Sequence, residues 1–314
     1  MSAGATEGLV IGLDLGGTKI AAALVTPGGG VVARHARATP ALQGASAVLD
    51  ALAAAASAVD PTGQATMVGI AAAGVIDPRS GMVTSATESI RGWAGTALGT
   101  GLADRTGLQV ACDNDVRATA GPELTALPGS RGSLVFAAIG TGVGGAIAVD
   151  GRMLHGAAGI AGHFGHLPSA EAAGLPCTCG AVGHLEVIAS GPGITAHYER
   201  LSGTSAARLE VVAARAATGD QAAVRAITAG ASAAGRALGG LANAVGPDRV
   251  VIGGGVPHIG PLYRDVLNEA FAAELMPPLR GLVPQPPLHG RDAAVLGAAA
   301  LTVALPLHRP GAHR

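Results

Sequence analysis

The chain has 314 residues, with 20 lysines and arginines against 21 aspartates and glutamates, and a formal net charge of −1. This balance argues against the basic surface of a nucleic-acid-binding protein and against a polybasic membrane anchor, so we expect neither partner. Aromatic residues make up only 2% of the chain, so alanine, valine, leucine and isoleucine must fill the core. The length is sufficient for about two domains.

The sequence gives no sign of export. The first ten residues, MSAGATEGLV, lack a basic segment followed by an apolar one, so we expect no signal peptide, and the apolar run at 51–59 is too short to span a bilayer. The cysteines, Cys112, Cys177 and Cys179, are odd in number, and a Cys-x-Cys pair has poor geometry for a disulfide. Reduced thiols and a cytoplasmic location are therefore expected.

The amino-terminal part predicts an α/β domain. Short apolar runs at 9–13, 20–25 and 30–36 are separated by glycine turns, which indicates three antiparallel strands. An Ala- and Leu-rich segment of helix length follows at 44–59. After it we expect a strand at 66–72, a helix at 94–106, a strand at 108–112 and a helix at 115–127.

The pattern then begins again. Residues 132–156 repeat the succession of strands and glycine turns, and helices within 206–246, a strand at 249–253 and a helix at 292–305 are expected after them. A repeated pattern predicts an internal duplication, and hence two α/β lobes with a ligand cleft between them. We expect a first lobe at 1–117, to which the helix at 292–306 returns, and a larger second lobe at 118–291.

Glycine turns follow three of the predicted strands, in LDLGGTK (13–19), IGTGVGG (139–145) and VVIGGGV (250–256). Backbone N–H groups in such turns converge on anionic oxygens, and Asp14 is suited to hold Mg²⁺ through water. One such turn is more often only a hairpin. Two turns at matching positions of a duplicated unit nevertheless predict phosphate binding. The spacing matches neither a P-loop nor a dinucleotide-binding motif.

The stretch VACDNDVRATA (110–120) ends a predicted strand and opens a predicted helix. Helix capping accounts for one of its polar residues, Asp113, Asn114 and Asp115. The trio also offers a carboxylate to remove a proton and an amide to orient a hydroxyl, which phosphoryl transfer to an alcohol requires.

The segment at 155–186 contains a cluster of potential metal ligands. His166, Cys177, Cys179 and His184 provide four nitrogen and sulfur ligands, and Gly180 and Gly183 allow a tight turn. Structural zinc takes four such ligands in a tetrahedron. The alternative is that the cysteines are small buried residues and the histidines ordinary polar groups; clustered Cys and His in a reduced protein favour metal.

Together these motifs resemble the ROK family of sugar kinases and repressors, in the hexokinase/actin-like ATPase superfamily. The resemblance spans about residues 9–305 and is carried by DLGGTK, DND, GTGVGG, the histidine- and cysteine-rich segment and VVIGGGV. It implies a two-lobed actin-like (ribonuclease H-like) fold with duplicated βββαβα units, ATP with Mg²⁺, a structural Zn²⁺ and a homodimer. Repressors of the family carry an amino-terminal helix-turn-helix, for which this sequence leaves no room, so we expect a kinase.

The resemblance also implies a role for individual residues. Asp115 is the general base for the sugar 6-hydroxyl, and Asn114 binds a neighbouring hydroxyl. Glu186 holds the sugar near its anomeric end, and His166 serves both the zinc and the sugar. The other implied sugar ligands are Gly74, Ser89 and His163. The implied ligands of Mg²⁺ and ATP are Asp14, Gly16, Gly17, Thr18, Lys19, Gly140, Thr141 and Gly142, with Gly254 and Gly255 near the adenosine.

Three positions depart from the family pattern. His184 stands where the zinc-binding segment of the family, the zinc knuckle, usually has a third cysteine. Ser89 stands where an asparagine usually contacts the sugar. His163 replaces the glutamate of the glucokinase motif GEFGH, and in this it is similar to bacterial N-acetylmannosamine kinases. Neutral imidazole both donates and accepts hydrogen bonds, which suits an acylamino group. We therefore expect an ATP-dependent N-acetylmannosamine 6-kinase; the alternatives are a glucokinase, with His163 a neutral change in a broad hexokinase, and a non-catalytic sugar-sensing regulator.

Overall fold

The computed structural model describes residues 8–312, and these fall into two compact units. Unit 1 contains residues 8–126, 155–160 and 288–312, and unit 2 contains 127–154 and 161–287. The prediction that no signal peptide is present rests on residues 1–10, of which 1–7 lie outside the described residues. Within the described range, no helix is both long and apolar enough to cross a membrane.

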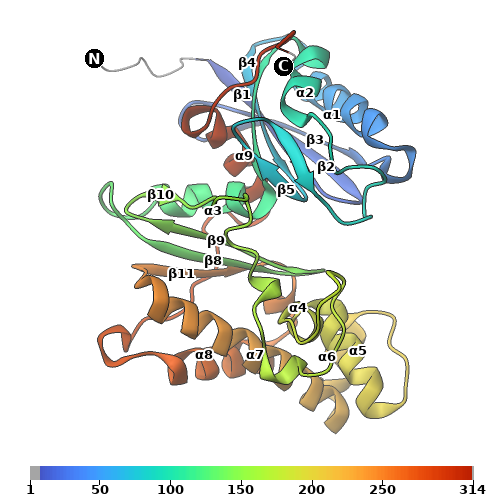
Figure 1. Ribbon diagram of the computed structural model, residues 1–314, viewed down its shortest axis with the longest axis vertical. Helices are drawn as coiled ribbons and strands as arrows, with labels where there is room; N and C mark the ends of the chain where they lie inside the picture. Colours follow the sequence, from blue (N-terminus) through green and yellow to red (C-terminus); the bar gives the residue numbers. More distant parts are fainter. Residues whose placement is uncertain (1–7, 313–314) are drawn as a thin grey trace. The chain divides into compact units, whose positions relative to one another are not determined.

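Unit 1 is built on a five-stranded sheet of order β3-β2-β1-β4-β7 (Figure 1). The first three strands of the chain are antiparallel, as predicted, and β4 and β7 run parallel to β1. The strands are β1 (Leu9–Leu15), β2 (Lys19–Val25), β3 (Val31–Ala38), β4 (Ala65–Ala72) and β7 (Gln109–Asn114).

Side-chain alternation along β1 directs residues to the two faces of this sheet. Leu13 and its neighbours at every second position pack with α1 (Ala45–Val59) and α2 (Leu98–Thr106) on one face. Val10 packs with α9 (Ala293–Ala304) on the other face. The approach of α9 is so close that a Cβ at Gly12 would overlap the carbonyl oxygen of Val295, so this strand position requires glycine.

Helix α3 (Asp115–Thr125) belongs to unit 1, which therefore extends to residue 126 rather than ending at the expected 117. The reason is its packing on α9, where a Cβ at Gly297 would overlap the carbonyl oxygen of Ala118. The helix expected from 94 begins at Leu98, because Gly92 and Gly95 turn the chain at positive φ before it. A short hairpin of β5 (Val75–Asp77) and β6 (Met82–Ser85) was not predicted.

Unit 2 repeats the topology with a sheet of order β10-β9-β8-β11. Its strands are β8 (Leu134–Ile139), β9 (Val143–Val149), β10 (Arg152–Met153) and β11 (Arg249–Gly253). The first three are antiparallel and β11 is parallel to β8, which matches β3-β2-β1-β4 in order and direction. The predicted duplication is thus present. Within the described residues, the sheet of unit 2 has no counterpart of β7, which lies beside β4 in unit 1.

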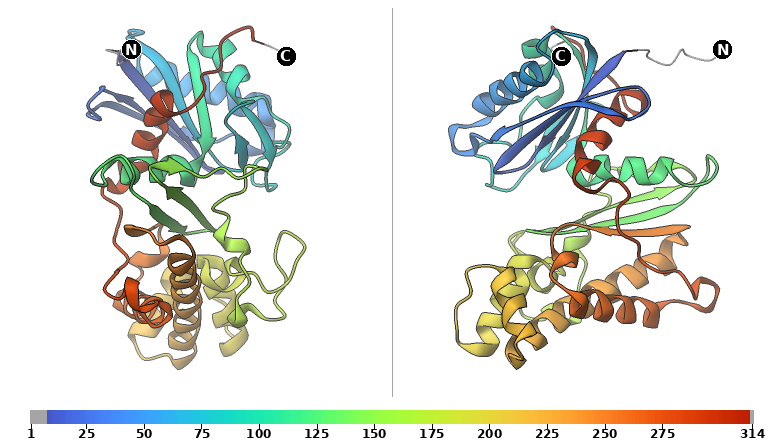
Figure 2. Two further views of the ribbon diagram at one scale, coloured as in Figure 1. Left: turned by 60° about the vertical axis from the view of Figure 1, so that its left-hand side comes forward. Right: turned by 180° about the vertical axis from the view of Figure 1, so that it is seen from behind.

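The helices of unit 2 lie on one side of its sheet (Figure 2). They are α4 (Glu186–Ala189), α5 (Gly191–Ser202), α6 (Leu209–Ala217), α7 (Gln221–Val245) and α8 (Pro261–Glu274). Alternate residues of β8, such as Val135 and Ala137, form the core with them. The helical region expected at 206–246 is broken at Gly219, whose φ is +93°, and Asp220 caps the following helix. Helices α4, α5 and α8 were not predicted.

The remaining helical turns are 3-10 turns at Ala41–Gln43, Phe164–His166, Ala170–Ala172, Val256–His258, Pro277–Leu279 and Gly290–Asp292. All three cysteines are free thiols, as predicted. Cys112 lies in the core of unit 1, where burial first and the charge of Asp113 second raise the pKa of its thiol.

Candidate active site and metal site

The predicted base and magnesium ligand lie at one edge of the unit 1 sheet. Strands β1, β4 and β7 are parallel, so their carboxyl ends meet at the same edge. Asp14 is next to the end of β1, Gly74 follows β4 and Asn114 ends β7. The Gly74 carbonyl accepts a hydrogen bond of 3.0 Å from the Asn114 amide, which ties two of these strand ends together.

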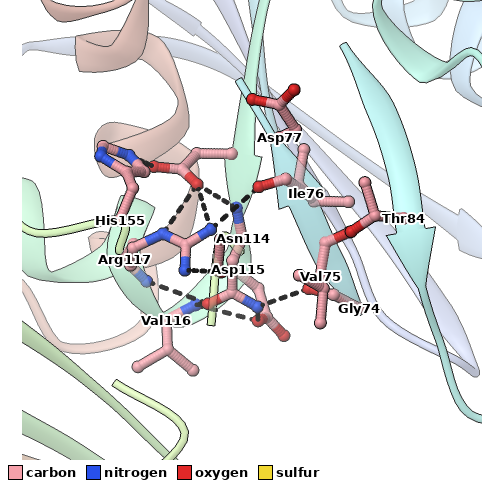
Figure 3. Close-up of polar contacts among 12 residues, drawn as sticks. Gly74, Val75, Ile76, Asp77, Thr84, Asn114, Asp115, Val116, Arg117 and His155 are labelled. Atoms are coloured by element: carbon pink, nitrogen blue, oxygen red, sulfur yellow. Dashed lines mark hydrogen bonds and ion pairs between the residues drawn. The ribbon is translucent and has the colours of Figure 1, made fainter. Parts of the chain in front are cut away.

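Asn114 caps α3 and orients Asp115, the predicted base (Figure 3). Its Oδ1 accepts from the N–H groups of Val116 (3.0 Å) and Arg117 (3.3 Å). Its amide donates to Gly74 O and, at 2.8 Å, to Asp115 Oδ1. An asparagine side chain offers two donors and two acceptor positions, and all four are in use here. The role predicted for Asn114 as a sugar ligand would require it to release one of these partners, whereas its hold on Asp115 is direct.

Burial raises the pKa of Asp115 to about 6, although hydrogen bonds from the Val116 N–H and the Asn114 side chain and the charge of Arg117 act in the opposite direction. Burial first and the charge of Asp115 second likewise raise the pKa of Asp14 to about 6, against the effect of Lys19. A general base works best with a pKa near the operating pH, which suits Asp115. Two mutually repelling carboxylates at one edge favour a bound divalent cation, which fits the predicted magnesium role of Asp14.

The first predicted phosphate loop joins β1 to β2. Gly16 N–H donates to Lys19 O at 3.0 Å, and Thr18 O accepts from Thr39 N at 3.0 Å. Neither Gly16 nor Gly17 has a positive φ, and a Cβ at either would meet nothing closer than 3.5 Å. The fold itself therefore does not require glycine here, whereas a ligand lying against the backbone would. The atom nearest to a Cβ at Gly17 belongs to Ser89. This serine is exposed, and its hydroxyl shares a hydrogen bond of 3.0 Å with the hydroxyl of Thr87.

The second loop opens onto a cavity of about 590 Å³ in unit 2, a size typical of small-molecule sites. Gly140, Thr141 and Gly255, three of the predicted nucleotide ligands, line it. The sequence did not identify the rest of the lining, which is Gly191, Pro192, Thr195, Ala196, Glu199, Ala206, Ala207, Arg208, Leu209, Glu210, Val256 and Ile259. A helix-start signal was available for α5, because Ser190 caps it and Pro192 occupies its first turn. Gly254 has a structural task, since a Cβ there would overlap Ile139 O.

The predicted sugar ligands of unit 2 lie together beside this loop. Glu186 begins α4, and its Oε2 accepts from the Val143 N–H at 2.9 Å, directly after Gly142. A Cβ at Gly165 would lie 3.1 Å from the same oxygen, which places the Phe164–His166 turn against Glu186. The rings of His163 and His166 are stacked with centroids 6.4 Å apart. His163, His166 and Glu186 thus share one corner of unit 2.

His166, Cys177, Cys179 and His184 form a cluster whose ligand atoms lie within 4.8 Å of one another. The two histidine Nδ1 atoms are 3.3 Å apart, and the paired sulfur–nitrogen distances are 3.8 Å (Cys177–His166) and 3.3 Å (Cys179–His184). Tetrahedral zinc with standard bond lengths requires about 3.3 Å between two nitrogens and about 3.6 Å between nitrogen and sulfur. The cluster therefore fits zinc, with the two Nδ1 atoms as ligands.

The chain matches the ROK family model over residues 10–304. It belongs to the ROK family. It is 34% identical to the N-acetylmannosamine kinase of Citrobacter koseri over 93% of this chain and 97% of that protein. Among solved structures it is similar to the ROK hexokinase from Thermus thermophilus (TM-score 0.81, 30% identity, 93% of this chain and 97% of that one). It is also similar to a ROK family glucokinase from Streptomyces griseus in complex with glucose and AMPPNP (TM-score 0.79, 29% identity, 94% and 99%). The predicted family and fold class are confirmed.

Proposed function

We propose that this ROK protein transfers the γ-phosphoryl group of ATP to the 6-hydroxyl of N-acetylmannosamine. The observation that carries the reaction type is the Asp115 carboxylate, fixed by Asn114 and with its pKa raised to about 6 at the edge that also holds Asp14. The sugar is suggested by relatives named N-acetylmannosamine kinase, which are 34–35% identical over 93% of the chain.

In the proposed reaction, Asp115 takes the proton of the 6-hydroxyl while the sugar oxygen forms a bond to the γ-phosphorus. The bond from that phosphorus to the bridging oxygen breaks, and ADP leaves with the electron pair. Backbone N–H groups of the loops at 16–19 and 140–142 hold the phosphates, and the unit 2 cavity takes the adenosine. Asp14 holds Mg²⁺, which neutralises charge on the phosphates.

His163 is the residue that we propose to select the acylamino sugar. Its neutral imidazole can donate one hydrogen bond and accept another, whereas the glutamate of the similar glucokinase motif only accepts. Glu186 and His166 complete the sugar ligands in unit 2. His166 presents Nδ1 to the metal cluster, so its Nε2 is the ring atom that remains for the sugar. We propose that structural zinc fixes this ring, with two thiolates balancing the metal charge.

A sugar panel tests the proposal. The wild-type protein and the variants His163→Glu and His163→Gln are assayed by coupled ADP release with N-acetylmannosamine, N-acetylglucosamine and glucose. We expect wild type to prefer N-acetylmannosamine, and His163→Glu to shift the ratio of kcat/KM values toward glucose. The glutamine variant is the matched control, because it keeps both a donor and an acceptor and should shift the ratio less.

The alternative is a glucokinase, which the similarity to the Streptomyces griseus enzyme favours. A wild-type preference for glucose would establish it and remove His163 as the selector. A protein that binds sugars without releasing ADP would instead be a sugar-sensing regulator, and its Asp115→Asn variant would bind sugar as wild type does.

A further inference from the structure

A buried ion pair lies directly beside the proposed base in unit 1 (Figure 3). Asp113 is 2% exposed and Arg117 1%, and their closest oxygen and nitrogen atoms are 2.7 Å apart. Arg117 Nε also donates to Asp113 Oδ1 at 2.9 Å, and the same oxygen accepts from the Asn114 N–H at 2.7 Å. The pair therefore holds the backbone at the residue that precedes Asp115.

The pair also reaches two other segments of unit 1. Arg117 donates to the carbonyl oxygens of Gly159 at 2.9 Å and Ile76 at 3.1 Å. On the other side, His155 Nε2 lies 2.9 Å from Asp113 Oδ2. His155 and Gly159 belong to the stretch 155–160, which is part of unit 1 although the residues before and after it belong to unit 2. Both ends of this stretch are thus attached to the Asp113–Arg117 pair.

The stretch 155–160 has little regular structure of its own. It contains no helix or strand, Gly156 and Gly159 have φ of +73° and +72°, and Ile160 is 56% exposed. Ordering such a segment costs conformational entropy, which its contacts must offset. The segment runs directly into the His163–His166 turn, since His163 is four residues beyond Gly159.

Stability alone does not account for a buried ion pair. Desolvation offsets most of the attraction, and apolar side chains of similar volume often replace such a pair at no loss of stability. Lysine could not serve the same partners, because only the planar guanidinium offers five donors in a fixed arrangement. The contacts of Arg117 join the base turn to the segment that leads to the proposed sugar selector.

We propose that Arg117 and Asp113 are positioning residues, whose buried pair fixes the 155–160 segment to the Asn114–Asp115 turn and so orders the sugar-binding residues that follow. The inference rests on the proposed sugar-kinase function for its kinetic consequence. The attachment of the segment itself is a property of unit 1 that can be measured without any substrate.

The test uses the double variant Asp113→Leu/Arg117→Met, which removes both charges and leaves neither buried alone. We expect its Tm to stay within a few degrees of wild type, with amide hydrogen exchange at 155–163 at least tenfold faster. With sugar and ATP, kcat/KM for the sugar should fall at least tenfold, while KM for ATP changes less than twofold. The matched control is Asp50→Asn/Arg105→Met, which breaks another ion pair of unit 1, of 2.6 Å, between α1 and α2. It should change neither the amide exchange at 155–163 nor kcat/KM for the sugar.

A double variant with wild-type Tm, exchange and kcat/KM would overturn the proposal, because the pair would then neither order the 155–160 segment nor affect the sugar kinetics. If the double variant does not fold, His155→Ala decides, since it removes one attachment and keeps the ion pair. Faster exchange at 155–163 with a raised sugar KM supports the proposal, and unchanged exchange overturns it. If wild type phosphorylates no sugar, the proposed function fails, while the exchange measurement still tests the attachment.

Discussion

Asp115 is the residue at which a conservative substitution should cost the most activity. In the wild-type protein, Asp115 Oδ1 accepts from the Val116 N–H at 2.9 Å and from the Asn114 amide at 2.8 Å. Asparagine at this position keeps an oxygen that can accept both hydrogen bonds. It removes only the capacity to take a proton. General-base catalysis contributes about 10²–10⁴-fold, so we expect kcat of Asp115→Asn to fall at least 100-fold while sugar binding stays measurable.

The pKa of Asp115 also predicts the pH range over which kcat should fall. With a pKa of about 6, the carboxyl is about 90% ionised at pH 7 and about 10% ionised at pH 5. An ordinary aspartate with a pKa of about 3.9 would still be about 90% ionised at pH 5. Because only the ionised form accepts the proton, kcat should fall about tenfold between pH 7 and pH 5.

The assay is kcat from pH 4.5 to 8.5 at saturating sugar and ATP, at two Mg²⁺ concentrations. The second concentration is needed because Asp14 also has a pKa of about 6. A loss of activity caused by Asp14 would move to lower pH as Mg²⁺ competes with the proton, whereas one caused by Asp115 would not. The reasoning is refuted if the loss begins only near pH 4, if it moves with Mg²⁺, or if Asp115→Asn retains more than a tenth of wild-type kcat.

Three further outcomes are expected. Asp115→Asn should raise Tm at pH 7.5, because a folded-state pKa above the unfolded value destabilises the protein above pH 6; calorimetry should find no difference below about pH 3.8. Gly255→Val should raise KM for ATP at least tenfold with unchanged Tm, because its φ of −78° suits any residue and a Cβ points into open space; Gly254→Val should instead lower Tm. Metal analysis should find about one zinc per chain, and Cys179→Ser should lower both zinc content and Tm, by at least about 5 °C.

The elements that the sequence predicted well have strong local signals. The strands of both sheets are apolar runs bounded by glycine turns, and the sharp stop at Gly107 and the cap at Asn114 are visible in the sequence. The β5–β6 hairpin was missed because three- and four-residue strands show no usable periodicity. Helix α8 was missed although signals were available, because its buried residues Tyr263, Leu267 and Phe271 recur at helical spacing and a proline occupies its first turn.

For the candidate site, local motifs identified residues whose chemistry is set by their neighbours in the chain. The capping turn at Asn114 and the cysteine knuckle at 177–180 are of this kind, because most of their partners lie within a few residues. Contacts across long stretches of sequence were out of reach. Nothing local indicates that Arg117 donates to Gly159, 42 residues away, or that the segment 206–210 lines the cavity with Gly255.

The repeated topology accounts for the different roles that we propose for the two units. In each unit, two parallel strands place a glycine turn at their carboxyl ends, β1 with β4 and β8 with β11. Unit 1 adds a third parallel strand, β7, and with it the Asn114–Asp115 turn and the buried pair of Asp113 and Arg117. In unit 2, α5 and the backbone around Gly255 instead line a cavity, and the carboxylates of this cavity, Glu199 and Glu210, lie on α5 and α6 rather than at a strand end. The divergence of these two edges separates the proton abstraction that we propose at the end of β7 from the nucleotide binding that we propose at the turn after β11. A substitution at one edge should therefore leave the other intact, so that Asp115→Asn acts on kcat and Gly255→Val acts on KM for ATP.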